Sequence, residues 1–163
     1  MPTPVIPVDL SGNVQGKAYS ASASFTPAAT SHTAGDAVGA AAEFALNAPT
    51  ASVLKIIGAS MLVAGGTNET STWRVHLFSV TPPSAVADDG AIVIAAADRA
   101  SYLGYFDFAQ LVDMGDTLYI EATPNKIIRL TGTSVFGYLS NLTTVSTANV
   151  ARTVTLHTII SPL

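Results

Sequence analysis

The side chains best suited to chemistry are few in this chain and stand far apart. Its three histidines are His32, His76 and His157, and none has another histidine two or four residues away. Such spacing is what brings two imidazoles onto one face of a strand or helix, where they can share a metal ion. The chain also has no cysteine, which removes thiolate ligands, disulfides and cysteine nucleophiles together. We therefore predict no metal site and no cofactor.

Acidic residues gather in two short segments, Asp-Asp-Gly at 88–90 and Asp-Met-Gly-Asp at 113–116. Neither has the alternating aspartates that wrap a loop around calcium. Turn formation accounts for both, because Asp caps turns and Gly accepts a positive φ. Asp107 and Glu121 could act as the paired carboxylates of a glycoside hydrolase if their strands met, but a sugar cleft usually shows several aromatic residues and the chain has one tryptophan.

Motifs for nucleophilic catalysis and nucleotide binding are missing from the sequence. No serine lies in a G-x-S-x-G elbow, and there is neither a phosphate-binding loop nor a G-x-G-x-x-G pattern. We expect that the protein is not an enzyme, and the sequence points to no catalytic residue.

Charge is scarce throughout the chain. Charged residues make up 11% and apolar residues 48%, the mean hydropathy is +0.42, and the formal net charge is −4. The seven basic residues are scattered, which disfavours nucleic-acid binding, and no apolar run approaches the ~18 residues of a membrane-spanning helix. Two interpretations remain open: a tight β-domain with a neutral surface, or a surface buried against copies of itself or a partner.

The strongest single element is the segment Trp-Arg-Val-His-Leu-Phe-Ser-Val at 73–80, which the double proline at 82–83 ends. Alternation places Trp73 and Leu77 on one face and Arg74 and Phe78 on the other. Because both faces carry apolar groups, we expect this strand to lie in the middle of a sheet.

The longest apolar stretch, 51–64, predicts a second long strand, kinked at Gly58. Strict alternation would place Lys55 and Met61 on the same face. A loop at 65–71 separates this strand from the segment at 73–80. The arrangement of long strand, turn and long strand predicts an antiparallel pair.

Turn residues at near-regular spacing divide the rest of the chain into short strands, and Pro124-Asn125 is expected to reverse the chain between two of them. In all we expect eight to ten strands and no long helix. This pattern predicts an all-β fold, an antiparallel β-sandwich of jelly-roll type. The further predicted strands are 17–26, 43–46, 92–94, 102–106, 117–121, 126–130, 135–139 and 151–159.

We divide the chain into an extended N-terminal arm, 1–16, and a β-sandwich domain, 17–163. The arm has three prolines, which favour an extended chain over a regular element. It is either a frayed terminus or an arm that contacts a neighbour, since its apolar run is an unusual choice for a free tail. No secretion signal is apparent, so synthesis in the host cytoplasm is expected. The candidate partner-binding residues of the arm are Val5, Ile6, Pro7 and Val8.

Aromatic residues cluster at 102–108 and 136–138. They are either core and edge residues of neighbouring strands or a rigid contact surface, since aromatic side chains commonly anchor interfaces. On the second interpretation, Tyr105 and Phe108 are candidate partner-binding residues.

Five ordered blocks of sequence resemble a family of tailed-bacteriophage head decoration, or cement, proteins. Together they cover roughly 17–159. The blocks are Ser-His-Thr-Ala-Gly-Asp-Ala-Val-Gly at 31–39, Trp-Arg-Val-His-Leu-Phe at 73–78 with Pro-Pro-Ser at 82–84, Asp-Arg-Ala-Ser-Tyr-Leu-Gly-Tyr at 98–105, Asp-Thr-Leu-Tyr at 116–119 and Phe-Gly-Tyr-Leu at 136–139.

The resemblance implies a small β-sandwich, commonly trimeric, bound outside the capsid where hexamers and pentamers meet. It implies the major capsid protein and further copies of the chain as partners, a location on the outer surface of the virion, and no catalytic residues. Asp36 and Gly39 match the family's loop motif, although a turn would account for both. A carbohydrate-binding sandwich on the virion, used for host attachment, is the alternative.

Overall fold

The computed structural model describes residues 16–28, 31–65, 69–147 and 149–161. Within these residues the chain is all-β, every strand pair is antiparallel, and no helix is present, as the sequence predicted. Only Gly16 of the predicted arm lies in the described part. The strands are β1 (Ala18–Phe25), β2 (Ser31–His32), β3 (Ala42–Phe44), β4 (Val53–Ala64), β5 (Trp73–Phe78), β6 (Tyr102–Phe108), β7 (Val112–Asp113), β8 (Thr117–Ala122), β9 (Lys126–Arg129), β10 (Val135–Asn141), β11 (Val145–Ser146) and β12 (Arg152–Ile160).

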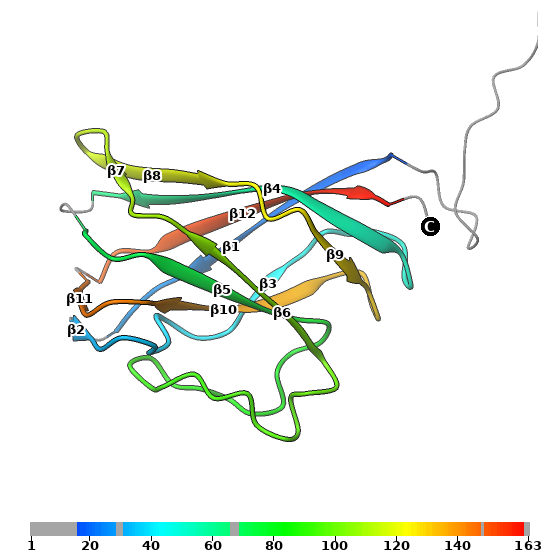
Figure 1. Cartoon of the computed structure of the whole chain (residues 1–163), viewed down its shortest axis with the longest axis horizontal. Helices are drawn as coiled ribbons and strands as arrows, with labels where there is room; N and C mark the ends of the chain where they lie inside the picture. Colours follow the sequence, from blue (N-terminus) through cyan, green and yellow to red (C-terminus); the bar gives the residue numbers. More distant parts are fainter. Residues whose placement is uncertain (1–15, 29–30, 66–68, 148, 162–163) are drawn as a thin grey trace, which may run out of the picture.

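Two sheets pack face to face (Figure 1). The first has the order β1-β12-β4-β8-β7, with β9 also paired to β4, and the second has the order β3-β10-β5-β6. The main strands therefore pair from the ends of the chain inward: β1 with β12, β3 with β10, β4 with β8, and β5 with β6. A long hairpin rolled up in this way is a jelly roll, which confirms the predicted fold class.

The two strands predicted to form a hairpin, at 51–64 and 73–80, are not partners. The structure places β4 between β12 and β8 in the first sheet, and β5 between β10 and β6 in the second. The predicted hairpin between them is wrong because each strand has a strongly apolar face, and facing one another across the sandwich buries both faces in one core. The central position predicted for β5 is confirmed.

Two smaller predictions are also wrong. β8 and β9 both pair antiparallel with β4, so they run in the same direction. Pro124-Asn125 therefore separates two successive strands along one side of β4 and does not reverse the chain. The segment 92–94 forms no strand and belongs to the long connection 79–101.

A β-bulge divides β4 at the predicted kink. His157 of β12 pairs with Gly58 and Thr158 pairs with Ile56, so Ile57 is an extra residue in the ladder. The inward-facing set therefore changes parity along the strand. Ile56 and Met61 are both buried, whereas strict alternation had placed them on opposite faces.

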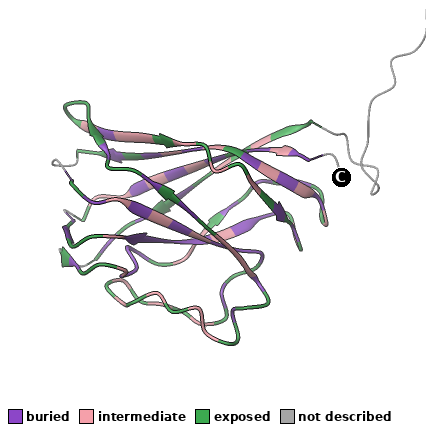
Figure 2. Cartoon of the chain, in the orientation of Figure 1, coloured by how far each residue is buried: buried purple, intermediate pink, exposed green. Residues whose placement is uncertain are grey.

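One apolar core fills the space between the sheets (Figure 2). From β5 it takes Trp73, Val75 and Leu77, all fully buried. A second, smaller cluster lies on the other side of β5, where Phe78 and Tyr138 pack with apolar residues of the connection 79–101. The two-faced pattern of β5 is thus satisfied within the single chain, without a neighbouring copy.

Arg152 is a charged residue inside the main core. Its guanidinium pairs with the Glu69 carboxylate, and it lies 5.1 Å from the centre of the Trp73 ring. Arg152 is fully buried and Glu69 is 5% exposed. Removing either partner would leave the other charge buried and unpaired, which is strongly destabilising.

Asp88 joins three separate parts of the chain. Its carboxylate accepts hydrogen bonds from Ala28 N at 2.8 Å, Gly39 N at 2.6 Å and His32 Nε2 at 3.0 Å. The turn predicted at 88–90 is therefore only part of the role of Asp88. Its side chain also holds the connection 79–101 against the first strands of the sandwich. Thr147 Oγ1 lies 3.2 Å from the other His32 ring nitrogen.

The loop that carries Asp36 and Gly39 is a local structural device. The Asp36 carboxylate accepts from the Thr33 amide at 2.8 Å and from its hydroxyl, closing a tight turn. Gly39 has a φ of +79°, and a Cβ there would lie 2.8 Å from Thr26 N. Only glycine fits at this close approach. Turn formation thus accounts for both residues of the motif.

We predict that Asp88→Asn lowers the free energy of unfolding by about 2 kcal/mol, because a carboxylate that accepts several hydrogen bonds is replaced by an amide that offers one oxygen. Asp89→Asn is the matched control, since Asp89 is exposed and Asn tolerates its φ of +63°. Chemical denaturation of both variants measures the difference. Equal stability of the two would contradict the role given to Asp88.

Candidate functional site

Exposed apolar side chains concentrate on one face of the molecule. Of the eight large apolar residues that are well exposed in the described part of the chain, five belong to the outward side of the first sheet and its β7–β9 edge. We call this set the apolar outer face. Its members are Ile57 (40% exposed), Leu62 (40%), Val112 (57%), Met114 (68%) and Ile127 (62%).

The strand register explains why these residues share a face. Val112 lies directly opposite Tyr119, which in turn lies opposite Leu62. Directly paired residues of an antiparallel ladder point to the same side of the sheet. Leu62, Met114 and Tyr119 line a shallow hollow of about 460 Å³ between β4 and the β7–β8 turn. The Tyr119 hydroxyl donates to Glu121 at 2.7 Å, which raises the pKa of Tyr119.

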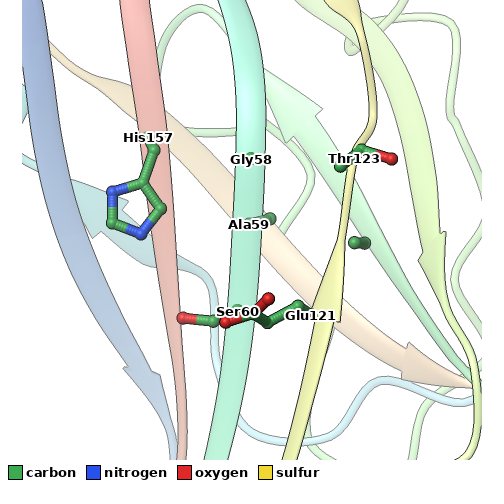
Figure 3. A pocket seen from close by; sticks show the side chains of 7 residues that line it. Gly58, Ala59, Ser60, Glu121, Thr123 and His157 are labelled. Carbon is green, nitrogen blue, oxygen red and sulfur yellow. The ribbon is translucent and has the colours of Figure 1, made fainter.

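A second hollow, of about 280 Å³, opens beside the bulge (Figure 3). His157 of β12 and Glu121 of β8 stand on either side of β4, whose Gly58 leaves room between them. The His157 Nδ1 is 3.2 Å from the hydroxyl of Ser20. The lining has one carboxylate, one imidazole and several small side chains, and it includes no Phe, Tyr or Trp. It is a shallow polar surface depression that suits water or a small polar contact group.

The remaining part of this outer face, over β1 and β12, is uncharged and hydroxylated. Ser22 bonds to Thr155 at 2.8 Å and Ser24 to Thr153 at 3.1 Å across the two strands. These pairs hold short polar side chains in a regular row. The outward side of the first sheet as a whole therefore combines apolar residues and neutral hydroxyls with a few charged side chains, among them Lys55, which pairs with Ile127, and Glu121, which pairs with Ser60.

The outward side of the second sheet carries a compact polar and aromatic cluster. Arg74 forms a two-pronged ion pair with Asp107, at 2.8 and 2.9 Å, and its guanidinium stacks 3.7 Å from the centre of the Tyr105 ring. Asp107 raises the pKa of Arg74. Tyr105 is 47% exposed, so its ring is available for contact. These three residues form a rigid, solvent-facing plate.

Phe108 is not on this plate. It is 1% exposed and packs edge-on against Phe106 in the main core. Alternation along β6 decides this, because Asp107 faces outward and both neighbours therefore face inward. Its proposed role as a contact residue is incompatible with the fold. Phe106 and Tyr138 are likewise buried, so most of the aromatic clusters belong to the cores.

His76 lies beside the plate and is neutral at ordinary pH. Burial lowers its pKa to about 4, and the nearby Arg74 charge acts in the same direction, against a smaller opposing effect of Asp107. Its ring nitrogens lie 3.2 Å from the Tyr102 hydroxyl and 3.4 Å from the Ser140 hydroxyl. Both contacts suit a neutral ring.

The residues considered for catalysis and metal binding do not converge. Asp107 and Glu121, the possible carboxylate pair, lie on the outward sides of different sheets. His32, His76 and His157 occupy three separate regions. Among the described residues, no group of three or more His, Asp or Glu side chains is placed to hold a metal ion. The same part of the chain contains no helix long and apolar enough to cross a membrane.

Comparison with known proteins yields fold likenesses only. No protein-family model and no curated protein matches the sequence. Among solved structures, the chain is similar to one from the acid-stable capsid of Helicobacter pylori bacteriophage KHP30, at 16% identity, with 90% of each chain covered and a TM-score of 0.38. A chain of Cocksfoot mottle virus has 8% identity, coverage of 90% of this chain and 96% of that chain, and a TM-score of 0.31. One of Sacbrood virus of honeybee has 11% identity, 92% and 72% coverage, and a TM-score of 0.34.

At these TM-scores the likenesses add nothing to the strand order that the chain itself shows. The candidate contact residues Val5, Ile6, Pro7 and Val8 lie outside the described residues.

Sequence reasoning missed the apolar outer face because its members come from four separate segments. One feature of the sequence could have indicated this face, namely an apolar residue in an otherwise polar turn, such as Met114.

We predict that His76 makes the protein less stable in moderate acid. Unfolded His76 takes up a proton near pH 6.5, while the folded residue resists protonation until about pH 4, so stability falls as the pH drops through that window. The loss is roughly 2 kcal/mol, allowing for partial exposure. Unfolding of wild type and His76→Gln between pH 7 and 4 measures it. His157→Gln is the control, since that residue is exposed. If the His76→Gln variant loses as much unfolding free energy as wild type between pH 7 and 4, His76 is not the cause of the acid sensitivity.

Proposed function

We propose that this chain is a structural virion protein, a capsid decoration or cement protein that binds the outer surface of a phage head. The major capsid protein is its partner, and it stabilises the mature shell by clamping neighbouring subunits. The sequence blocks that resemble the decoration family support the proposal, together with the jelly-roll fold.

The observation that carries the proposal is the apolar outer face. Met114 and Ile127 are each more than 60% exposed, although the chain has ample core to bury apolar residues. Exposed apolar groups gathered on one side of a protein commonly mark an interaction surface. Neutral hydroxyls cover the adjoining β1–β12 part of the same sheet side, and the charged Lys55 and Glu121 would need partners in a capsid contact or a place at its solvated rim.

The few charged residues of this chain have identifiable places in the fold. Ion pairs anchor selected points, namely Arg152 with Glu69 in the core and Arg74 with Asp107 outside. The other charged side chains, Lys55 and Glu121 among them, are scattered among neutral polar and apolar groups. A protein that binds assembled shells and not free subunits stabilises the shell by mass action. A β-sandwich whose contact face is rich in apolar and hydroxyl groups suits that task.

Self-association as a trimer and contact through the arm 1–16 are part of the proposal. Val5, Ile6, Pro7 and Val8 would extend the contact beyond the sandwich, and Tyr105 offers a second exposed anchor. The hollow around His157 does not favour the carbohydrate-binding alternative, because its lining includes no Phe, Tyr or Trp against which a sugar could stack.

We predict that Met114→Glu combined with Leu62→Glu lowers occupancy on purified phage heads at least tenfold, because two charges would be buried at the capsid contact. Quantitative gel densitometry of sedimented heads measures the bound chain. Val93→Glu is the matched control, as Val93 is 67% exposed but lies on the connection 79–101. Full occupancy by the double variant would exclude this face from the capsid contact.

We predict that deletion of residues 1–16 leaves a folded oligomer that no longer occupies phage heads. Among the described residues the sandwich core draws on residues from Tyr19 onward, so we expect the sandwich to fold when the arm is removed. Light scattering reports the oligomer and head sedimentation reports binding. Undiminished occupancy by the truncated chain would refute the contact role of the arm.

A further inference from the structure

β1 is an unusual edge strand. In the described part of the chain it pairs with β12 on one side only, and its eight residues, Ala-Tyr-Ser-Ala-Ser-Ala-Ser-Phe, include no charge, no proline and no glycine. Natural proteins usually protect a sheet edge with charges, prolines, bulges or very short strands. The other edges of the two large sheets in the described part follow that rule: β7 has two residues, β3 has three, β9 carries Lys126 and Arg129, and β6 carries Asp107 and a register shift.

The free side of β1 presents backbone groups ready for pairing. The amide of Ile160 donates to Lys17 O, which fixes the alternation of the ladder with β12. The N–H and C=O groups of Ser20, Ser22 and Ser24 therefore point away from β12. Among the described residues, no hydrogen bond from elsewhere reaches the backbone of these three serines. The edge can thus accept another strand without breaking any bond described in the fold.

The sequence of β1 has two-fold symmetry in its chemistry. Read outward from Ser22, it shows Ala21 and Ala23, then two serines, then Tyr19 and Phe25. Two antiparallel copies centred on Ser22 would match aromatic with aromatic, alanine with alanine and serine with serine. In this register the outward-pointing serine backbones pair with one another, and each sheet face continues across the junction.

We propose that β1 pairs with β1 of a second copy of this chain, antiparallel and centred on Ser22, joining two first sheets into one continuous sheet. The occupant is a second copy because the edge complements itself in length, polarity and side-chain type. Such a contact is isologous, with the same residues contributed by both partners. Tyr19 and Ala21, half-buried at the rim of the core, would be covered by it.

This contact goes beyond the proposed function and does not depend on it. It uses the edge of the first sheet, whereas the capsid contact uses residues of the β7–β9 end such as Met114. A two-fold contact is also compatible with a separate three-fold contact, so it could connect trimers. Failure at the edge would leave the capsid proposal unaffected, and failure of capsid binding would leave the edge contact unaffected.

Cysteine trapping in the full chain tests the proposal, because the natural chain contains no cysteine. Paired residues of adjacent strands lie within disulfide range. Under mild oxidation we expect Ser22→Cys to form a covalent dimer at least tenfold faster than Thr155→Cys, a control on the same sheet face away from the edge. Non-reducing gel electrophoresis measures the rates.

The register gives a sharper version of the test. Ser20 should face Ser24 of the second copy, so Ser20→Cys alone and Ser24→Cys alone should cross-link no faster than the control. An equimolar mixture of the two should cross-link at about half the rate of Ser22→Cys, because only mixed pairs bring the two cysteines together. Circular dichroism confirms that each variant is folded. If Ser22→Cys reacts no faster than Thr155→Cys, or if the mixture shows no preference, the two-fold pairing of β1 is wrong.

Discussion

The structure depends on hiding the apolar faces of β4 and β5 against each other. Each strand lies inside its own sheet, and each directs large apolar residues into the same core, Met61 from one side and Trp73 from the other. Burial of apolar surface is the dominant favourable term in folding, and it is largest where two such faces meet. The jelly-roll path, which sends β4 and β5 into opposite sheets, follows from this constraint.

The bulge at Ile57 and Gly58 connects this core to the surface. Without it, strict alternation would turn either Ile56 or Met61 out of the core. With it, both are buried, and the extra residue Ile57 is placed on the outside. The same irregularity opens the hollow next to His157, where Gly58 has no side chain to fill it. One inserted residue thus keeps the interior packed and shapes the outer face.

The long connection 79–101 acts as part of the fold and not as a free loop. Its apolar residues cover Phe78 and Tyr138 on the outward side of the second sheet. Asp88 fastens it to Gly39 and His32, and Tyr138 receives the amide of Val86 at its hydroxyl oxygen, 3.0 Å away. The second sheet is therefore partly covered by its own chain, whereas the first sheet leaves its apolar outer face open. This asymmetry is the physical reason for placing the proposed capsid contact on the first sheet.

The sequence by itself determined the fold class, the extent of most strands, and the central position and two faces of β5. Period-two patterns and proline or glycine punctuation are local, so they can be interpreted without partners. Tertiary structure alone decided that β4 and β5 face each other, that Phe108 is internal, and that Arg152 finds Glu69 within the core. It also assembled Leu62, Val112 and Ile127 into one surface. These outcomes depend on which distant segments become neighbours, and that choice is made by the burial of whole sheet faces, which no local pattern encodes.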